Sequence, residues 1–464
     1  MALTHTSSAL RLLLFSNFAV FLAVYLNSAL VHGRAKESNS YQLVDVDSLL
    51  PKPYCTTNNR DSAVGSSKLK VTYKYGPCAP IGHAKEIPSS EQVLLHDEAR
   101  IKFMNDRISN LYPTEESNSP LPISTYSKEA GIYTVTIKMG TPQHDYSVSI
   151  DTGSDITWLQ CQPCSTGCYS NPKLRFHPSK SSTYVNGSCK SNSGKEYNIY
   201  YNDKSYSRGQ WGCDTLTLEP SDVTPNFEFG CGQYNSDEFG SAVEVGMLGL
   251  GRGPTSLLSQ TASQYGKTFV YCFPGPISST GFLLFGDKAK SSSSAFKFTP
   301  LLKGPDSSYY FLELVAISVG GTKLKISPSV FRSPGTLIDS GTVITRLPAP
   351  AYSALKSAFK KSMSKYPSAL AADLLDTCYN LERYKKVNLP KIVFHFGGRA
   401  DVTLHPSGTV WTQSKKQVCL GFAPTPPNNF TIIGNNQQHA LEVFYDTEGG
   451  RIGFGSTGRC GTLY

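Results

Sequence analysis

Two stretches of the sequence each place an acidic residue and a glycine among hydroxyl residues. An apolar run ends at Asp151 in SIDTGSDITW, and another ends at Asp339 in GTLIDSGTVITRLP. The residues that follow are Thr152, Gly153 and Ser154 in the first stretch, and Ser340, Gly341 and Thr342 in the second. Either stretch alone favours an ordinary turn, because Asp, Thr, Gly and Ser are common turn residues. Their repetition in one 464-residue chain predicts a matched pair of loops.

Each half of the chain also carries two apolar residues and a glycine after its acidic loop. These are Met247, Leu248 and Gly249 in GMLGLG, and Ile432, Ile433 and Gly434 in TIIGNN. Two acidic loops that are each followed by the same element indicate a duplicated β unit.

Two carboxylates brought face to face share one proton, because ionising both in one place is costly. The ionised partner can activate a water molecule as general base, and the protonated partner can donate to a carbonyl oxygen. Glycine lets the two loops approach closely, and the hydroxyl residues can hold the carboxylates by hydrogen bonds. The pair Asp151 and Asp339 therefore predicts hydrolysis of a peptide bond by water, with no cofactor and no metal.

The elements that must position these loops are short strands. Glycine, proline, tyrosine and phenylalanine number 39, 29, 26 and 23, and only 17% of the residues are charged. This composition favours strands joined by tight turns over long helices. From Gly131 onward apolar residues alternate with polar ones, as in YTVTIKMGTPQHDYSVSID. In this part of the chain, chiefly TSLLSQTASQYG and PAYSALKSAFKKSMSKY have a helical pattern.

From about residue 130 to its C-terminus the chain resembles the pepsin family of aspartic proteases, and most of all its plant, nepenthesin-like branch of secreted apoplastic enzymes. The resemblance implies a mainly β, bilobal, double-psi fold with two related lobes and a central substrate cleft. It makes Asp151 and Asp339 the catalytic residues. It also implies that Thr152 and Ser340 cross-brace the two loops, and the residues expected to bond to the outer carboxylate oxygens are Ser154 and Thr342.

The resemblance also places a flap over the cleft. In IYYNDKS it makes Tyr201 the flap tyrosine, and it makes Trp158 the tryptophan that bonds to that tyrosine. The flap departs from the family pattern, because Asn202 and Lys204 stand where glycines are usual. These side chains should stiffen the flap or change its turn.

The N-terminus has the pattern of a secretory signal peptide over residues 1–33. Arg11 precedes an apolar run from Leu12 to Val31, and cleavage after Gly33 fits the preference for small residues. A signal anchor is the alternative, since the run approaches membrane-spanning length. Polar residues within the run favour cleavage, and no second run of spanning length follows.

Residues 34–120 have the character of a pro-segment with a linker. SSEQVLLHDEARIKFMNDRISNLY spaces its apolar residues as a helix does, and the polar, proline-bearing PTEESNSPLP follows it. We expect the pro-segment to end between Pro113 and Ala130. A basic residue lying against two carboxylates would block them, and the candidates are Lys68, Lys70, Lys74 and Arg100. The lobes are then expected at 121–320, which includes the flap, and at 321–464.

Twelve cysteines are typical of a protein from an oxidising compartment. The spacing of Cys161, Cys164 and Cys168 could suggest zinc, but only one histidine, His177, lies nearby, so disulfides are favoured. The family resemblance pairs Cys378 with Cys419 and Cys272 with Cys460. It leaves the pairing of Cys161, Cys164, Cys168 and Cys189 open, because later cysteines of the family's insert are missing. Asn186 and Asn429 lie in glycosylation sequons.

The formal net charge is +9, but the lysine clusters lie apart and lack interleaved aromatic residues. This pattern argues against nucleic-acid binding. The sequence thus predicts a monomeric, secreted endopeptidase without a stable membrane anchor, made as a zymogen, that cuts extended peptides at acidic pH in the apoplast. The family suggests a role in plant defence or in extracellular protein turnover. The alternative is a catalytically weak or inactive pepsin-like binding or inhibitor protein; such proteins usually lose an aspartate or the flap tyrosine.

Overall fold

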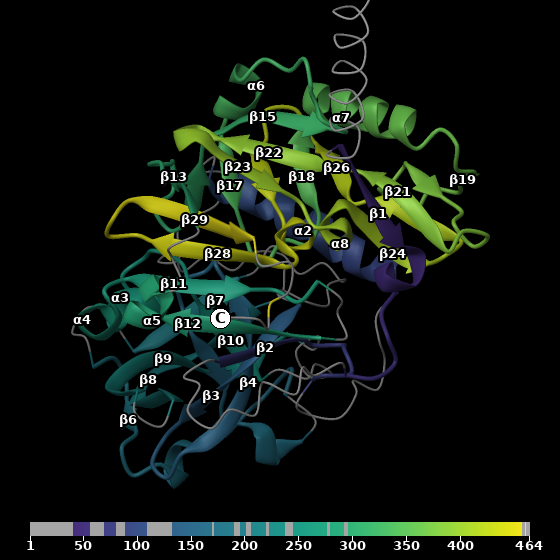
Figure 1. Cartoon of the computed structure of the whole chain (residues 1–464). Coiled ribbons are helices and arrows are strands. Elements are labelled where there is room, and N and C mark those ends of the chain that lie inside the picture. The colour runs from purple at the N-terminus through teal and green to yellow at the C-terminus, as the bar shows by residue number, and fades with distance from the viewer. Residues whose placement is uncertain are drawn as a thin grey trace, which may run out of the picture.

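The computed structural model describes residues 40–55, 69–79, 89–108, 132–168, 171–189, 195–200, 206–219, 222–236, 245–275, 279–291, 296–456 and 460. It confirms the mainly β fold predicted from the sequence. Figure 1 shows two masses of strands, one in blue and teal and one in green and yellow. We call the first the N-terminal lobe and the second the C-terminal lobe. The signal peptide predicted over residues 1–33 lies outside the described residues.

The largest sheet has 14 strands and reaches from one lobe into the other. In spatial order it contains β13 (Lys297–Pro300), β29 (Arg451–Ser456), β28 (Leu441–Asp446), β11 (Thr268–Cys272), β12 (Thr280–Phe285), β2 (Leu69–Tyr73), β3 (Tyr133–Met139), β4 (His144–Asp151), β10 (Gly246–Gly249), β5 (Trp158–Gln160), β9 (Asp222–Asn235), β8 (Tyr206–Glu219) and β6 (Val185–Asn186), with β7 (Glu196–Tyr200) paired to β8. The last two strands of the chain, β28 and β29, therefore join the sheet of the N-terminal lobe through β11.

Smaller sheets build the C-terminal lobe. One has β14 (Tyr310–Leu312), β17 (Thr336–Ile338), β27 (Thr431–Ile433), β18 (Thr345–Pro348) and β26 (Phe422–Thr425). The others are β16 (Thr322–Lys323), β15 (Leu314–Val319), β22 (Ile392–Phe396) and β23 (Ala400–Thr403), and then β19 (Ser368–Ala369), β20 (Cys378–Tyr379), β25 (Gln417–Leu420) and β24 (Val410–Ser414). The first of these sheets carries the second acidic loop.

The helices of the described residues are mostly short. They are α2 (Ser90–Ile108), α3 (Leu257–Gln260), α4 (Ala262–Tyr265), α5 (Gly286–Ser291), α6 (Ser329–Arg332), α7 (Ala349–Ser362) and α8 (Pro406–Thr409), with 3₁₀ turns at Val46–Leu49, Pro172–Leu174, Pro178–Lys180, Gly397–Arg399 and Asn435–Gln438. The two helical patterns expected in the second part of the chain correspond to α3 with α4 and to α7. No helix in the described ranges is both long and apolar enough to span a membrane.

The segment before residue 120 contributes three elements that pack on both lobes. Strand β1 (Tyr41–Asp45) pairs antiparallel with β21 (Lys386–Pro390) of the C-terminal lobe. Strand β2 lies inside the large sheet, between β12 and β3. Helix α2 begins at a reciprocal cap, in which Gln92 N donates to Ser89 Oγ (3.2 Å) and Ser89 N donates to Gln92 Oε1 (2.8 Å). Figure 1 shows α2, in blue, against the C-terminal lobe where the two lobes meet.

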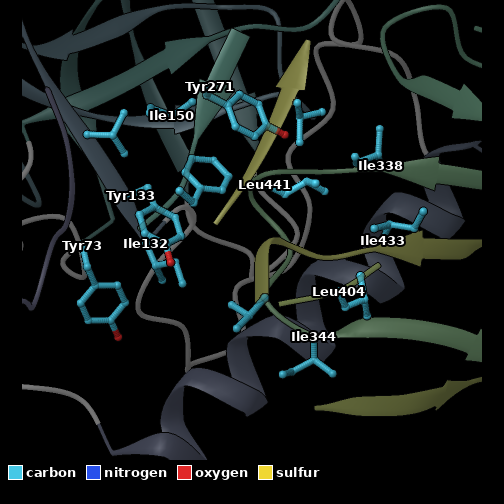
Figure 2. Close-up of a cluster of buried hydrophobic side chains, with 14 of the residues drawn as sticks. Tyr73, Ile132, Tyr133, Ile150, Tyr271, Ile338, Ile344, Leu404, Ile433 and Leu441 are labelled. Carbon is cyan, nitrogen blue, oxygen red and sulfur yellow. The ribbon is translucent and has the colours of Figure 1, made fainter. Parts of the chain in front are cut away.

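One hydrophobic core runs through both lobes. Figure 2 shows Tyr133 and Ile150 from the N-terminal lobe on one side, and Ile338 and Ile433 from the C-terminal lobe on the other. All four side chains are buried. Burying a side chain of this kind stabilises the fold by about 1.5–3 kcal/mol. Ile150 and Ile338 directly precede Asp151 and Asp339, so core packing also fixes the start of each acidic loop.

Six disulfides pair all twelve cysteines. They join Cys55 to Cys78, Cys161 to Cys231, Cys164 to Cys168, Cys189 to Cys213, Cys272 to Cys460 and Cys378 to Cys419. The partners of Cys161 and Cys189 thus come from β9 and β8, strands that follow the flap segment. No cysteine is left to bind zinc.

Candidate active site

The first acidic loop begins where β4 ends, at Asp151. Strand β10 runs parallel to β4 and places Gly249 beside Asp151, and Leu250 N donates to the Asp151 carbonyl oxygen (2.8 Å). The apolar residues of GMLGLG thus form the strand that supports this loop. The apolar residues of β4 and β10 stay buried in the sheet, and the chain turns out of the sheet only at the acidic loop.

The second acidic loop is built in the same way. Strand β17 ends at Ile338, and the parallel strand β27, from TIIGNN, lies beside it with Ile338 opposite Ile433. Asp339 N donates to the Ile433 carbonyl oxygen (3.1 Å). The two halves of the chain therefore carry the same unit, in which an acidic loop is backed by a parallel apolar strand.

A reciprocal pair of hydrogen bonds joins the two loops. Thr152 N donates to Ser340 Oγ (2.9 Å), and Ser340 N donates to Thr152 Oγ1 (2.8 Å). Both residues are buried. Each hydroxyl accepts a backbone N–H of the opposite loop, so the loops are held at a fixed distance, as the family resemblance implies for these two residues.

The two carboxylates have different surroundings. Asp339 accepts Gly341 N at Oδ1 (3.2 Å) and Thr342 Oγ1 at Oδ2 (2.6 Å). Asp151 accepts Gly153 N at Oδ1 (3.0 Å), while its Oδ2 is buried and has no hydrogen-bond partner within the described ranges.

The outer bond expected from Ser154 is not present. Its hydroxyl is buried and likewise has no partner among the described residues, whereas Thr342 makes the corresponding bond in the other loop. The charged contact of Asp151 is made at Oδ1, by Arg100. In this state the two loops are therefore not equivalent.

Arg100 of helix α2 contacts both carboxylates. Its Nη2 donates to Asp151 Oδ1 (2.7 Å) and to Asp339 Oδ1 (3.0 Å), and its Nε donates to Asp339 Oδ2 (2.9 Å). The side chain of Arg100 is 6% exposed and those of the two aspartates are 1% exposed. The guanidinium thus lies between the two acidic groups, away from solvent.

The two loop glycines make room for this guanidinium. A Cβ atom at Gly153 would stand 2.9 Å from Asp339 Oδ1 and would overlap Arg100 Nη2, and a Cβ atom at Gly341 would overlap the guanidinium as well. Any larger residue would therefore push the loops apart or exclude whatever lies between them.

Arg100 keeps its positive charge although it is buried. Burial alone would lower the pKa of the guanidinium, but the charges of Asp151 and Asp339 outweigh burial and hold that pKa above its ordinary value. Arginine is in any case always protonated in proteins. The site in this state therefore contains one cation bound to two acids.

Three further contacts hold α2 in place. Asp97 is bound by Arg346 of the C-terminal lobe (3.2 Å), and Arg107 pairs with Asp306 (3.0 Å). The helix also buries Ile101, Met104 and Ile108 in a cluster that contains Tyr309, Phe311, Leu337, Phe430 and Ile432. The helix is thus docked by apolar packing as well as by charge.

The other two basic candidates within the described ranges, Lys70 and Lys74, do not reach the carboxylates. Lys70 is exposed on β2, and the buried Lys74 lies with its Nζ 5.1 Å from the centre of the Tyr75 ring. Lys68 lies outside the described residues. Of the three candidates that the structure describes, Arg100 is the one that binds the pair of acids.

The predicted flap residues can be placed only in part. Tyr201, Asn202 and Lys204 lie outside the described residues. Trp158 is buried at 1% exposure, in a cluster with Ile156, Tyr197, Ile199, Trp211 and Met247. Tyr197 and Ile199 belong to β7, the strand that precedes the predicted flap residues, so Trp158 packs against this strand.

Some supporting residues were missed in the sequence. Asn435 Nδ2 donates to the Ser340 carbonyl oxygen (2.9 Å), and Gln438 Nε2 donates to the Asp339 carbonyl oxygen (3.2 Å). Both are buried amides in the run NNQQ after TIIG. Four adjacent amide residues directly after an apolar strand are a sequence pattern that indicates buried hydrogen bonds to a neighbouring loop. Asp155, four residues after Asp151, is also buried and accepts hydrogen bonds from Ser308 Oγ (2.6 Å) and Gly253 N (2.7 Å).

The remaining site predictions concern the surface and metals. Asn186 is exposed on β6, and Asn429 is partly buried beside Phe430. No group of three or more His, Cys, Asp or Glu side chains in the described part of the chain is arranged to hold a metal ion.

Comparison with known proteins agrees with this architecture. Residues 133–287 match the family described as "Xylanase inhibitor N-terminal", and residues 309–456 match "Xylanase inhibitor C-terminal". Two solved structures have the same fold, those of the protein named EDGP (TM-score 0.57, 21% identity, 71% of this chain and 94% of that one) and of soybean basic 7S globulin (TM-score 0.56, 20% identity, 72% and 95%).

Relatives with higher sequence identity than these two structures identify the family. An aspartyl protease family protein of Arabidopsis thaliana is 41% identical over 95% of this chain and 98% of its own length. Aspartic proteinase nepenthesin-2 of Nepenthes gracilis is 32% identical over 78% of this chain and 85% of its own length. The chain belongs to the pepsin-like aspartyl protease family, in its plant branch. It is an aspartic endopeptidase by this relationship, and the predicted resemblance is confirmed.

Proposed function

We propose that Asp151 and Asp339 are the catalytic pair of a secreted endopeptidase that is made as a zymogen and works at acidic pH. The observation that supports this most is the buried Arg100 bridge between the two carboxylates. Its guanidinium lies where the pair would hold a water molecule, and it comes from a helix that precedes both lobes.

The proposed reaction needs the pair with one proton. Asp151 or Asp339 in its ionised form takes a proton from water as general base, and the other donates its proton to the carbonyl oxygen of the scissile bond. The water oxygen attacks the carbonyl carbon to give a diol. The C–N bond then breaks as the first acid passes the proton it took from water to the nitrogen, and the second acid takes a proton back from the diol. The Thr152–Ser340 brace keeps the two acids in position without a change of shape.

Acid favours both activation and catalysis in this proposal. Protonating Asp151 or Asp339 removes a charge that binds Arg100, so the helix is released more easily as the pH falls. Loss of the second proton towards neutral pH would switch off the general acid. We propose that the cut that separates the pro-segment lies between Pro113 and Ala130.

The alternative is an inactive binding or inhibitor protein of the same fold. Both aspartates, both loop glycines and both bracing hydroxyl residues are present, and these would be free to change if the site were not used. These residues favour the enzyme. Plant defence and extracellular protein turnover stay predictions of its biological role.

The direct test is to express the full chain in a secreting host and follow cleavage of a denatured protein after acidification, with and without pepstatin. We expect a pepstatin-sensitive activity that needs acid. N-terminal sequencing of the product locates both cuts. Absence of any pepstatin-sensitive cleavage across the acidic range would contradict the proposal and favour the binding protein.

A further inference from the structure

The carboxylate of Asp97 occupies a site made of three hydrogen-bond donors on the C-terminal lobe. Val343 N donates to Oδ1 (2.6 Å), and Ile344 N (3.1 Å) and Arg346 Nη2 (3.2 Å) donate to Oδ2. The side chain of Asp97 is 0% exposed and that of Arg346 is 2% exposed. Figure 2 shows Ile344 next to the blue-violet helix, which is α2.

The chemistry of this site selects an acid. The backbone N–H groups and the guanidinium only donate hydrogen bonds, and arginine stays charged. A carboxylate presents acceptors only, and hydrogen bonds to a charged group are the stronger kind. A neutral amide in the same place would turn donors of its own towards other donors.

The three donors belong to the protease and not to the pro-segment. Val343, Ile344 and Arg346 follow directly on Thr342 in the second acidic loop and in β18. Among the described residues, the acids paired with Arg346 are Asp97 and Glu98, and both come from α2. When α2 leaves, the donors remain and their acidic partners go with the helix.

The site lies close to the catalytic pair. Asp97 and Arg100 are three residues apart on α2, so their side chains leave the helix about 5–6 Å from each other on one face. An extended peptide rises by about 3.3 Å per residue. A substrate side chain in the Asp97 position would therefore belong to a residue about two positions from the scissile bond.

We propose that Val343, Ile344 and Arg346 form a substrate subsite of the mature enzyme that takes a Glu or Asp side chain within about two residues of the cleaved bond. In the uncut chain, Asp97 would then occupy the position of the substrate's acidic side chain, and Arg100 would occupy the position of the catalytic water. The inference rests on the proposed protease activity, and it adds which peptides that activity prefers.

The experiment compares peptides that differ only in Glu against Gln. Several peptide pairs share one scissile bond, and each pair places the Glu or Gln at a different position before or after that bond. The activated wild-type enzyme is tested on every pair. Burial raises the pKa of the Asp97 carboxyl, with Arg346 and the two backbone N–H groups acting against that shift. The assay is therefore run at the highest pH that retains activity, where glutamate is ionised. We expect one position at which kcat/KM for Glu exceeds that for Gln by about tenfold or more.

The variant Arg346→Gln should bring this ratio close to one, because the positive charge is lost. The matched control is Arg332→Gln in the same lobe, whose arginine is 62% exposed and pairs with Glu313. The control should keep the wild-type ratio. Should Arg346→Gln fail to fold, Arg346→Lys keeps the charge and should keep the sign of the preference.

The outcomes separate the two proposals. If the wild-type enzyme cuts both peptides of every pair and never prefers Glu, the subsite is wrong whatever the variants do. The proposed protease activity is then still supported. An Arg346→Gln enzyme that keeps the full preference overturns the subsite too. Wild type that cuts no peptide overturns the protease itself, and the subsite with it.

Discussion

Replacing Arg100 by glutamine tests whether α2 silences the enzyme through its charge. The substitution removes the guanidinium from between Asp151 and Asp339, together with three hydrogen bonds of 2.7, 2.9 and 3.0 Å. It leaves the apolar contacts of the helix, including those of Ile101 and Met104, unchanged. We expect the full-length variant to cut substrate before its own chain is cut.

The size of the effect follows from burial. Removing one member of a buried ion pair costs about 3–5 kcal/mol. The lower end applies here, since the two acids left behind can share a proton. A loss of about 3 kcal/mol in docking raises the fraction of molecules with α2 displaced by roughly a hundredfold.

The assay measures the first cleavage of a fluorogenic peptide at mildly acidic pH, with the length of the enzyme chain followed in parallel. Wild type should show a lag that ends as the chain is cut, and Arg100→Gln should show activity from the start. The control is Lys102→Gln, which removes one positive charge from the exposed face of the same helix and should keep the lag. Equal lags in wild type and Arg100→Gln would refute the charge block.

Three further predictions concern the proposed pair, a buried histidine and a disulfide. Replacing Asp151 or Asp339 by Asn should lower kcat on the order of a thousandfold while the chain still folds, and near-normal turnover in either variant would contradict the pair. Burial lowers the pKa of His439 to about 4, so its neutral form stabilises the fold fully above its ordinary value of about 6.5. This stabilisation, about 3 kcal/mol, is lost as the pH falls from 6.5 to about 4. Urea unfolding should therefore show that His439→Gln loses less stability than wild type over this pH range. Replacing Cys272 and Cys460 by serine removes a link across 188 residues and should lower the free energy of unfolding by at most about 5 kcal/mol; an unchanged urea midpoint would show that the link contributes nothing.

The sequence predicted the centre of this molecule better than its surroundings. Asp151 and Asp339 could be found because a duplicated unit leaves the same short pattern twice, and the apolar residues that support each loop repeat with it. The family resemblance implied that Thr152 and Ser340 brace the two loops, and the structure has a reciprocal pair of hydrogen bonds between them. A short motif of this kind determines its own local structure.

Contacts between distant segments could not be read in the same way. The sequence offered four basic residues as blockers, and only the fold distinguishes Arg100 from Lys74, whose side chain lies against Tyr75. The sequence left the partners of Cys161 and Cys189 open, because later cysteines of the family's insert are missing. They lie instead on β9 and β8, which sheet pairing brings alongside.

Asp97 and Arg346 illustrate the same limit. Each has an unremarkable place in the sequence, one in a helix of mixed charge and one in a short strand. Their ion pair joins residues 249 positions apart, so it exists only through the docking of α2. Hydroxyl geometry is a second limit, since the Ser154 bond expected from the family pattern is not made in the state with Arg100 bound.

Because β2 lies inside the large sheet, cutting the chain and shedding the proposed pro-segment would be two different events. The backbone of β2 pairs with β12 on one side and with β3 on the other. It cannot leave without stripping hydrogen-bond partners from both neighbours. A cut confined to the residues between α2 and β3 would thus leave a particle of two chains, in which the smaller chain is a structural subunit. Such a particle would have the mass of the uncut protein in gel filtration and separate into two bands only after denaturation.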